Sequence, residues 1–369
     1  MTIVSEAARI RSLRETGRKQ LVVLAYDEDP RLVNQALAHH LAEYAGWRRG
    51  PRSLLVATRV LAEKLGLLRH IETRSLGAPH DDVFWHKTYE YQPALSQSEQ
   101  ERAEQGLTAL GITESTKAIA ILTRDRAFFK SISVNEEWLR RHEYRNCQIE
   151  NYSHAIEFAH QHGFRSVRVG RVSDNHLNIE PDGYVDYSSS PVQSDLMDLV
   201  LAARCEFIVT CSSGLDGLYW LCGKPFVGVN LPWLDGKFSN FSLCLPKRMF
   251  VEEEGRLTEL PLIAVTSPSF VPQLSTNQFN VPHWNGTPIV FQENSAAEIL
   301  ETMQLALAMR ADPRLVEARR ALVAPLWAEF NARTPASNLG ADSRVRIPAM
   351  PMPDSVIARF LEVQGDNSR

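Results

Sequence analysis

Residues 210–214, which read TCSSG, stand where a predicted strand meets a predicted helix. The β-branched stretch before them predicts a buried strand, and residues 214–222 have helical spacing. A helix N-terminus offers free N–H groups and a partial positive charge that suit a phosphate, and small side chains let the phosphate approach the backbone. The segment therefore predicts a phosphate site that includes Ser212, Ser213 and Gly214. The alternative is that Ser212 or Ser213 only caps the helix.

Arg124 follows another apolar stretch, residues 118–123, that predicts a buried strand. An arginine at the end of a strand can bind a diphosphate at two points, because its guanidinium is a planar fork of donors. The alternative is a solvated, charged loop, since residues 123–126 read TRDR. Asp125 in this loop and Asp27 after an earlier strand are candidates for a catalytic base only through their positions at strand ends.

Arg168 lies inside the predicted strand at residues 166–170, which otherwise has the composition of a buried strand. A buried charge is costly unless it is paired. Arg168 therefore either pairs with a carboxylate such as Asp186 or points to a ligand, and both alternatives stay open.

Two polar segments precede predicted helices. Residues 186–195 are dense in hydroxyl groups, and we interpret them as a capped loop with Ser194 as the N-cap of a helix at residues 194–204. Residues 294–298 read NSAAE and have the spacing of a capping box that ends at Glu298. The alternative for Glu298 is a carboxylate that accepts a ribose hydroxyl.

The elements that must position these residues alternate between short apolar strands and helices of about ten residues, which indicates βα units and a parallel sheet. The strands are predicted at residues 118–123, 166–170, 206–210, 225–229 and 288–291, and the helices between them at 151–162, 194–204, 214–222 and 296–309. Ahead of this series, a strand at 21–26 and helices at 30–44 and 54–68 predict a small first lobe; residues 77–98 are predicted as loop and 313–333 as a closing helix.

The composition restricts the class of protein. The net charge of -4 does not favour a nucleic-acid partner. The five cysteines form no C-x-x-C pair, so we expect a reducing compartment, and with neither a signal-like nor a spanning segment we expect a cytoplasmic protein. The basic patch of Trp47, Arg48, Arg49 and Arg52 predicts at most weak, peripheral contact with the inner membrane face. The sequence contains no G-x-S-x-G, Walker A or G-x-G-x-x-G motif, which argues against a serine hydrolase, a P-loop NTPase and a usual dinucleotide oxidoreductase.

An ordered set of short motifs between about residues 121 and 299 resembles a family of bacterial glycosyltransferases that are often found in surface-polysaccharide loci. A second, weaker likeness to the fucosyltransferase group rests on Arg124 and on Ser212-Ser213. The motifs of the first resemblance are Tyr144-Arg145-Asn146-Cys147, Asn151-Tyr152, Ala155-Ile156, Val167-Arg168-Val169-Gly170, Asp186-Tyr187, Ser194-Asp195-Leu196 with Asp198, and Ser213-Gly214-Leu215.

The resemblance implies an α/β fold with two Rossmann-like lobes (GT-B-like): residues 1–115 on the acceptor side, 116–310 binding the nucleotide sugar, and 311–369 packing back on the first lobe. It implies a GDP- or UDP-linked donor, a glycan or lipid-linked acceptor, and neither a cofactor nor a metal. Catalysis would stabilise charge on the leaving diphosphate, with Arg124 and Arg168 in the catalytic role. The nucleotide-sugar-binding residues would be Asp186, Tyr187, Ser194, Asp195, Ser212, Ser213 and Gly214.

The first lobe departs from the pattern of the family. A Gly-His-type loop is expected after its first strand, whereas Ala25, Tyr26, Asp27 and Glu28 stand there. The acceptor site and the catalytic base therefore stay open. So do two other classes: another nucleotide-sugar enzyme on the same fold, such as an epimerase or a pyruvyl-type transferase, and a non-catalytic sugar-nucleotide-binding module.

Overall fold

The computed structural model describes residues 23–24, 36, 39, 48–49, 92–178, 181–211, 213–232, 243–266, 270–271, 281–333 and 349–359. Most of the predicted first lobe, with Asp27, lies outside the described residues, as does Ser212. Strand β1 (Val23–Leu24) falls within the strand predicted at residues 21–26 and pairs in parallel with β2 (Arg48–Arg49). Within the described ranges, no helix is both long and apolar enough to cross a membrane.

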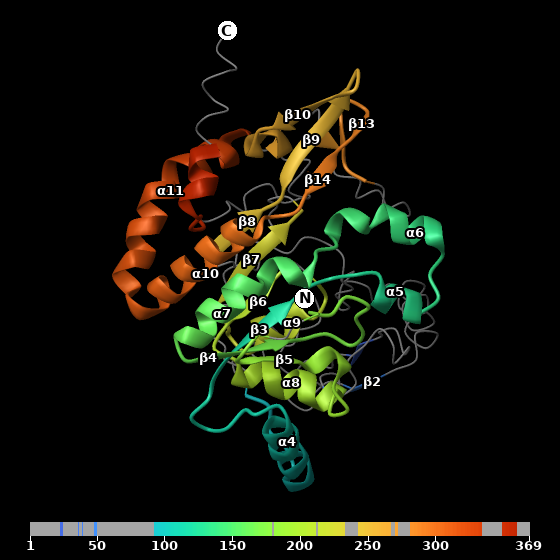
Figure 1. The fold of residues 1–369 in the computed structure, drawn as a ribbon, viewed down its shortest axis with the longest axis vertical. Coiled ribbons are helices and arrows are strands. Elements are labelled where there is room, and N and C mark those ends of the chain that lie inside the picture. Colours follow the sequence, from blue (N-terminus) through green and yellow to red (C-terminus); the bar gives the residue numbers. More distant parts are fainter. Residues whose placement is uncertain are drawn as a thin grey trace, which may run out of the picture.

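The centre of the molecule is a six-stranded sheet in which all neighbouring strands are parallel (Figure 1). Its spatial order is β5-β4-β3-β6-β7-β8, so the chain proceeds outward from β3 in one direction and then, from β6, in the other. The strands are β3 (Lys117–Leu122), β4 (Phe164–Arg168), β5 (Tyr184–Asp186), β6 (Ile208–Thr210), β7 (Phe226–Leu231) and β8 (Leu243–Pro246). The predicted parallel α/β sheet is thus confirmed.

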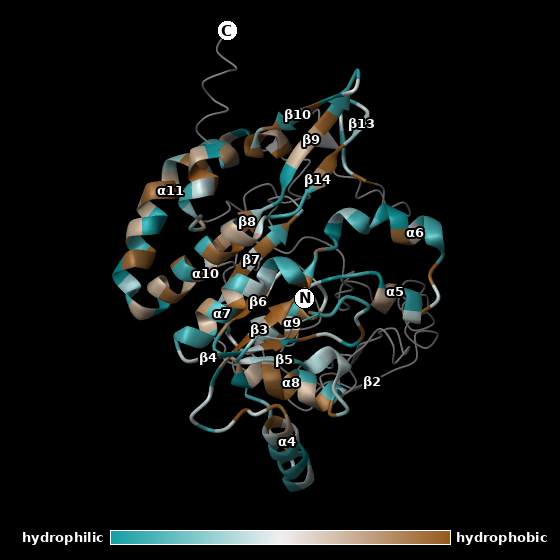
Figure 2. Ribbon diagram, in the orientation of Figure 1, coloured by the Kyte–Doolittle hydropathy of each residue, from teal (hydrophilic) through white to brown (hydrophobic). Residues whose placement is uncertain are grey.

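Helices cover both faces of this sheet. Helix α7 (Ser153–Gln161) connects β3 to β4 and packs against α10 (Ala296–Ala311), whereas α8 (Asp195–Arg204) connects β5 to β6 and packs against α9 (Asp216–Leu221) and α4 (Gln97–Ala109). Right-handed crossovers that run in opposite directions place α7 and α8 on opposite faces. The sheet is therefore buried between two layers, and Figure 2 shows hydrophobic residues concentrated in its strands.

Two smaller antiparallel sheets follow the central one. The first has the order β10-β9-β14, with β9 (Arg248–Glu253), β10 (Arg256–Leu260) and β14 (Val290–Gln292), and the second the order β11-β12-β13, with β11 (Phe270–Val271), β12 (His283–Trp284) and β13 (Thr287–Pro288). The prediction that residues 288–291 belong to the parallel series was wrong. A short apolar run does not reveal the direction of its partner strand.

Helix α4, which precedes β3, was not predicted, because its composition is polar and only Ala103 and Gly106 are buried.

The remaining helices are short and lie mainly in connections of the central sheet. The short helices are α5 (Ala127–Ser131), α6 (Glu136–Arg141), η3 (Glu143–Arg145), η4 (Ile149–Tyr152), η5 (Tyr187–Ser189) and η7 (Leu262–Thr266).

The closing helix α11 (Pro313–Arg333) has the predicted bounds and contacts α10. Residues 349–359 contact α11 and the central sheet: the Trp327 indole N–H donates to the Met350 carbonyl (2.9 Å), and the Cys244 N–H in β8 donates to the Pro351 carbonyl (3.0 Å). Packing of this segment against the first lobe stays a prediction.

Helix boundaries follow local capping chemistry. Ser194 caps α8 as predicted, because its hydroxyl accepts the Met197 N–H (3.2 Å). The capping box of α10 is also confirmed: the Ser295 hydroxyl accepts the Glu298 N–H (3.3 Å), and the Glu298 carboxylate accepts the Ser295 N–H (2.9 Å). Gly163 follows the end of α7 with φ of 80°, a conformation that glycine adopts without strain.

We predict that Ser295 and Glu298 act on stability. Ser295→Ala should cost about 0.5–2 kcal/mol of the free energy of unfolding, whereas Glu298→Gln should change it little, since glutamine also fits the box. Urea unfolding of both variants measures this. A ten-fold loss of nucleotide affinity in Glu298→Gln, about 1.4 kcal/mol, would contradict the capping role and favour ribose binding.

Candidate functional site

The sheet brings two of the predicted segments together. Strands β3 and β6 are direct neighbours, with Leu122 opposite Thr210, so Arg124 and Ser213 follow adjacent strand ends. The strand order also reverses between β3 and β6. In open parallel sheets, ligands bind outside the carboxyl ends of the strands at such a reversal. This edge is therefore the candidate site.

Arg124 is a mostly buried cation at this edge. Its Nε and Nη2 atoms are inaccessible to solvent and have no hydrogen-bond partner among the described residues. The guanidinium stacks on the ring of Phe129, with 4.6 Å from Cζ to the ring centroid. Burial, together with the charge of Arg145, lowers the pKa of Arg124 to about 10. Because burying an unpaired charge is costly, an anion at this position would stabilise the guanidinium.

The turn between β6 and α9 is held by Asp216. This carboxylate is 4 % exposed and accepts hydrogen bonds from the Thr210 hydroxyl (2.6 Å) and from the Ser213 N–H (2.9 Å). Burial raises its pKa to about 6, against the opposing effect of these two bonds. The turn is thus closed by an internal acceptor that sequence reasoning did not select.

This geometry modifies the predicted phosphate site. The N-cap of α9 is Leu215, so the alternative in which Ser213 caps the helix is wrong. The Ser213 N–H bonds Asp216, and α9 has only 6 residues, so helix-end binding is weaker than the sequence suggested. Gly214 leaves room, because a Cβ atom at its position would meet nothing within 4 Å. Ser212 lies outside the described residues.

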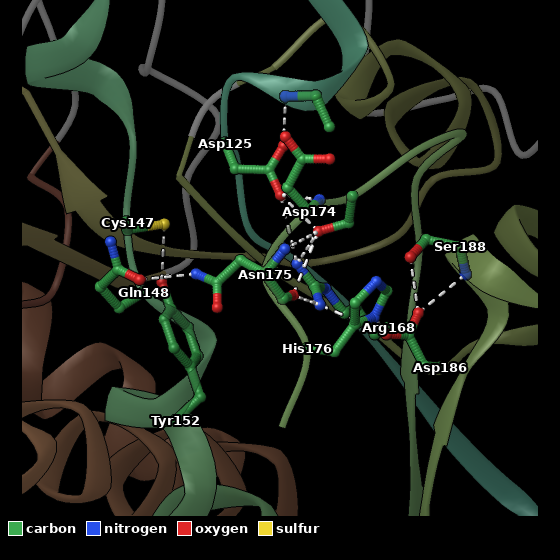
Figure 3. Close-up of polar contacts among 12 residues, drawn as sticks. Asp125, Cys147, Gln148, Tyr152, Arg168, Asp174, Asn175, His176, Asp186 and Ser188 are labelled. Atoms are coloured by element: carbon green, nitrogen blue, oxygen red, sulfur yellow. Dashed lines mark hydrogen bonds and ion pairs between the residues drawn. The ribbon is translucent and has the colours of Figure 1, made fainter. Parts of the chain in front are cut away.

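Arg168 is a second cation near this edge, and both of its terminal nitrogens have partners. It is 1 % exposed, forms an ion pair with Asp186 (3.3 Å), and also donates to the Ser173 hydroxyl and the Asn175 carbonyl (Figure 3). A second carboxylate, Asp125, lies 3.9 Å from the guanidinium. Of the two open alternatives, the structure has the pairing with Asp186.

Both carboxylates of this cluster are satisfied internally. Asp186 accepts the Ser188 N–H (3.0 Å) and hydroxyl (2.6 Å) and bonds His176 Nδ1 (2.9 Å). Burial tends to raise its pKa, but the bonds from Ser188 and His176 and the charge of Arg168 outweigh burial and lower it. Asp125 accepts the N–H groups of Ala127 (2.9 Å) and Asp174 (3.0 Å). The cluster thus joins the carboxyl ends of β3, β4 and β5.

The other predicted nucleotide-sugar residues also have internal partners. The Tyr187 hydroxyl donates to Asp198 (2.8 Å) and accepts the Ser194 N–H (3.1 Å), and Asp195 forms an ion pair with Arg171. These contacts position the connection from β5 to α8. Their role toward a nucleotide stays a prediction.

Four residues at the edge were not selected as site residues from the sequence. The Phe129 ring stacks on Arg124, and the charge of Arg145 lowers the pKa of Arg124. Asp216 accepts the Ser213 N–H in the neighbouring turn. Lys247 is 4 % exposed, and its ammonium donates to the Asn146 carbonyl (2.6 Å). Arg145 belongs to a motif of the family resemblance. Lys247 stands between β8 and β9, and no local pattern marks it.

Comparisons of the chain with protein-family models, with curated proteins and with solved structures gave no match.

We predict that Arg168→Met destabilises the fold by about 3–5 kcal/mol, because it leaves buried carboxylates without their cation. Arg165→Met is the matched control in the same strand: Arg165 donates to the Leu110 carbonyl (2.7 Å), so its loss should cost only about 1 kcal/mol. Chemical unfolding at neutral pH measures both. Normal stability with abolished turnover in Arg168→Met would instead assign Arg168 to catalysis.

We predict that Asp216→Asn raises the free energy of unfolding relative to the wild type, by an amount that grows as pH rises. The pKa of Asp216 is raised from 3.8 to about 6 in the folded state, so folding favours the protonated carboxyl. That contribution is complete below about pH 4 and is lost as pH rises through about 6. The difference in unfolding free energy between variant and wild type should therefore grow from pH 4 to pH 7, as urea unfolding measures. If the difference in unfolding free energy stays constant over this pH window, the pKa of Asp216 is not raised on folding.

Proposed function

We propose that this chain is a glycosyltransferase that uses a nucleotide sugar, with the donor diphosphate bound beside Arg124 at the carboxyl edge of the parallel sheet. One observation carries the proposal: a mostly buried guanidinium, without a hydrogen-bond partner among the described residues, lies where the strand order reverses. The family resemblance of the motifs between residues 121 and 299 supplies the reaction class.

Several features support an anionic ligand at this edge. Arg145 adds a second positive charge near Arg124, since it lowers the pKa of that guanidinium. The open space at Gly214 would let a phosphate reach the backbone of the β6–α9 turn. In this proposal, arginines stabilise the charge that develops on the leaving diphosphate, and no metal is needed.

The paired and unpaired arginines divide the roles that the sequence assigned to both. Arg168 donates hydrogen bonds to Asp186, Ser173 and Asn175, whereas the Nε and Nη2 groups of Arg124 can donate to a ligand. We therefore assign transition-state stabilisation to Arg124 and positioning of the strand ends to Arg168. The acceptor would bind against the first lobe, and its chemistry stays open between a glycan and a lipid-linked sugar.

A non-catalytic sugar-nucleotide-binding module is the second candidate, because binding alone would satisfy Arg124. The sequence after the first strand favours it, since Ala25-Tyr26-Asp27-Glu28 replaces the Gly-His-type loop of the family. Hydrolysis or transfer of a donor sugar by the purified protein separates the two.

We predict that UDP or GDP binds with equal affinity in the presence of EDTA and of Mg²⁺. A ligand that binds only the native state raises the melting temperature, so a thermal-shift screen with UDP, GDP, CDP and CMP selects the nucleotide and calorimetry gives its affinity. Binding that requires Mg²⁺ or Mn²⁺ would contradict the arginine-based site.

We predict that Arg124→Ala lowers nucleotide affinity by about 1.5–3 kcal/mol, since the guanidinium makes charge-assisted bonds. Arg124→Lys should recover only part, because an ammonium lacks the fork, and turnover should fall more than affinity in both variants. The matched control is Arg310→Ala, which removes a surface arginine that pairs with Glu206. A double-mutant cycle with Ser213→Ala tests the shared ligand: strict additivity in nucleotide binding would mean that Arg124 and Ser213 do not contact the same phosphates.

A further inference from the structure

One histidine at the carboxyl edge of the sheet is held by a buried carboxylate. His176, in the connection between β4 and β5, has its Nδ1 atom 2.9 Å from Oδ2 of Asp186 (Figure 3). The Asp186 side chain is 5 % exposed, whereas that of His176 is 46 % exposed. The pair thus joins a buried acceptor to an imidazole that a ligand can reach.

The bond to Asp186 decides which ring nitrogen of His176 carries the proton. Burial acts to raise the pKa of Asp186, but the bonds from Ser188 and His176 and the charge of Arg168 outweigh it and lower that pKa, so the carboxyl is ionised at neutral pH. An ionised carboxylate only accepts hydrogen bonds, so Nδ1 of the histidine is the donor. In the neutral ring the other nitrogen, Nε2, then has the lone pair that can take up a proton.

The segment that contains His176 is attached to the residue after Arg124. Asp125 accepts the Asp174 N–H (3.0 Å), which fixes this segment against the end of β3. Neighbouring strands lie about 4.8 Å apart, so Asp186 at the end of β5, two strands from β3, is about 10 Å from it across the edge. A donor with its diphosphate beside Arg124 and its sugar directed toward β5 would place the reacting carbon near His176.

The other described candidates near this edge are less suited to take a proton from a ligand. Asp125 already accepts the N–H groups of Ala127 and Asp174, and its side chain is 15 % exposed. His142 is 4 % exposed, and burial, with the positive charges near it, lowers its pKa to about 4. His176 combines an orienting carboxylate with an accessible ring, which is the arrangement that a general base needs.

We propose that His176 is the general base of the transfer reaction, an assignment that rests on the function proposed above. Nε2 takes the proton of the acceptor hydroxyl while the hydroxyl oxygen bonds to the anomeric carbon of the donor sugar. The bond between this carbon and the diphosphate oxygen breaks, and the diphosphate leaves with the electron pair beside Arg124. The Asp186 carboxylate stabilises the imidazolium that forms, and the proton then passes to solvent.

The variant His176→Asn separates proton transfer from the contact with Asp186, because an asparagine amide can donate to the carboxylate but cannot take up a proton. Release of UDP or GDP from a panel of UDP- and GDP-hexoses, with mono- and disaccharides or water as acceptor, measures turnover. We expect turnover to fall about 10²–10⁴-fold, with nucleotide affinity and melting temperature unchanged. The matched control is His162→Gln, at the amino end of β4, where the ring bonds the Phe158 carbonyl (2.8 Å); its turnover should equal that of the wild type.

A second variant, His176→Ala, tests the proton transfer directly. It leaves space at the position of the ring, so added imidazole should restore part of its turnover, whereas imidazole should not restore Arg124→Ala. Unchanged turnover in His176→Asn, a loss in His176→Ala that imidazole does not relieve, or a loss of nucleotide affinity as large as the loss of turnover would each overturn the assignment of His176 and leave the glycosyltransferase proposal standing. A wild-type protein that turns over no donor would overturn both.

Discussion

The pairing of β3 with a parallel strand on each side is the constraint on which the rest of the structure depends. Residues Ala118 to Ile121 have no exposed surface, so their backbone N–H and C=O groups need partners within the protein. Strands β4 and β6 supply those partners. Because parallel neighbours end at the same edge, this pairing places the residues after β3, β4 and β6 side by side.

Two arginines at that edge show how burial and pairing decide the use of a charge. Arg168 is the last residue of β4, and Arg124 lies two residues after β3. Arg168 forms an ion pair with Asp186, whereas the Nε and Nη2 atoms of Arg124 have no hydrogen-bond acceptor among the described residues. Removing one member of a buried ion pair leaves the other charge buried without a partner, which strongly destabilises the fold. Arg168 therefore contributes to the stability of the strand ends. An unpaired buried charge gains from a ligand, and this difference is why Arg124 carries the proposed function.

The same edge also contains a carboxylate that competes with an anionic ligand for a backbone N–H group. Asp216 takes the Ser213 N–H that a phosphate would use, and the raised pKa of its carboxyl reduces its negative charge toward acidic pH. Two buried cysteines adjoin the end of β3: the Cys147 N–H donates to the Arg124 carbonyl (2.9 Å), and the Cys211 N–H donates to the Leu122 carbonyl (3.3 Å). The candidate site thus combines the positive charges of Arg124 and Arg145 with one buried acid, Asp216.

The sequence by itself determined the features that depend on a few adjacent residues. The apolar run of β3, the caps at Ser194 and Ser295 and the turn at Gly163 were all predictable, since strand propensity, side-chain capping and glycine's freedom act locally. The alternation of these elements also predicted the parallel sheet. Only the tertiary structure decided that Arg168 pairs with Asp186 and that β14 runs antiparallel to β9. In both cases the partner is set by how distant strands are placed in the fold. Asp216 is different, because its bond to the Ser213 N–H spans only three residues, as in the box at Ser295, and the fold adds the burial that raises the pKa of its carboxyl.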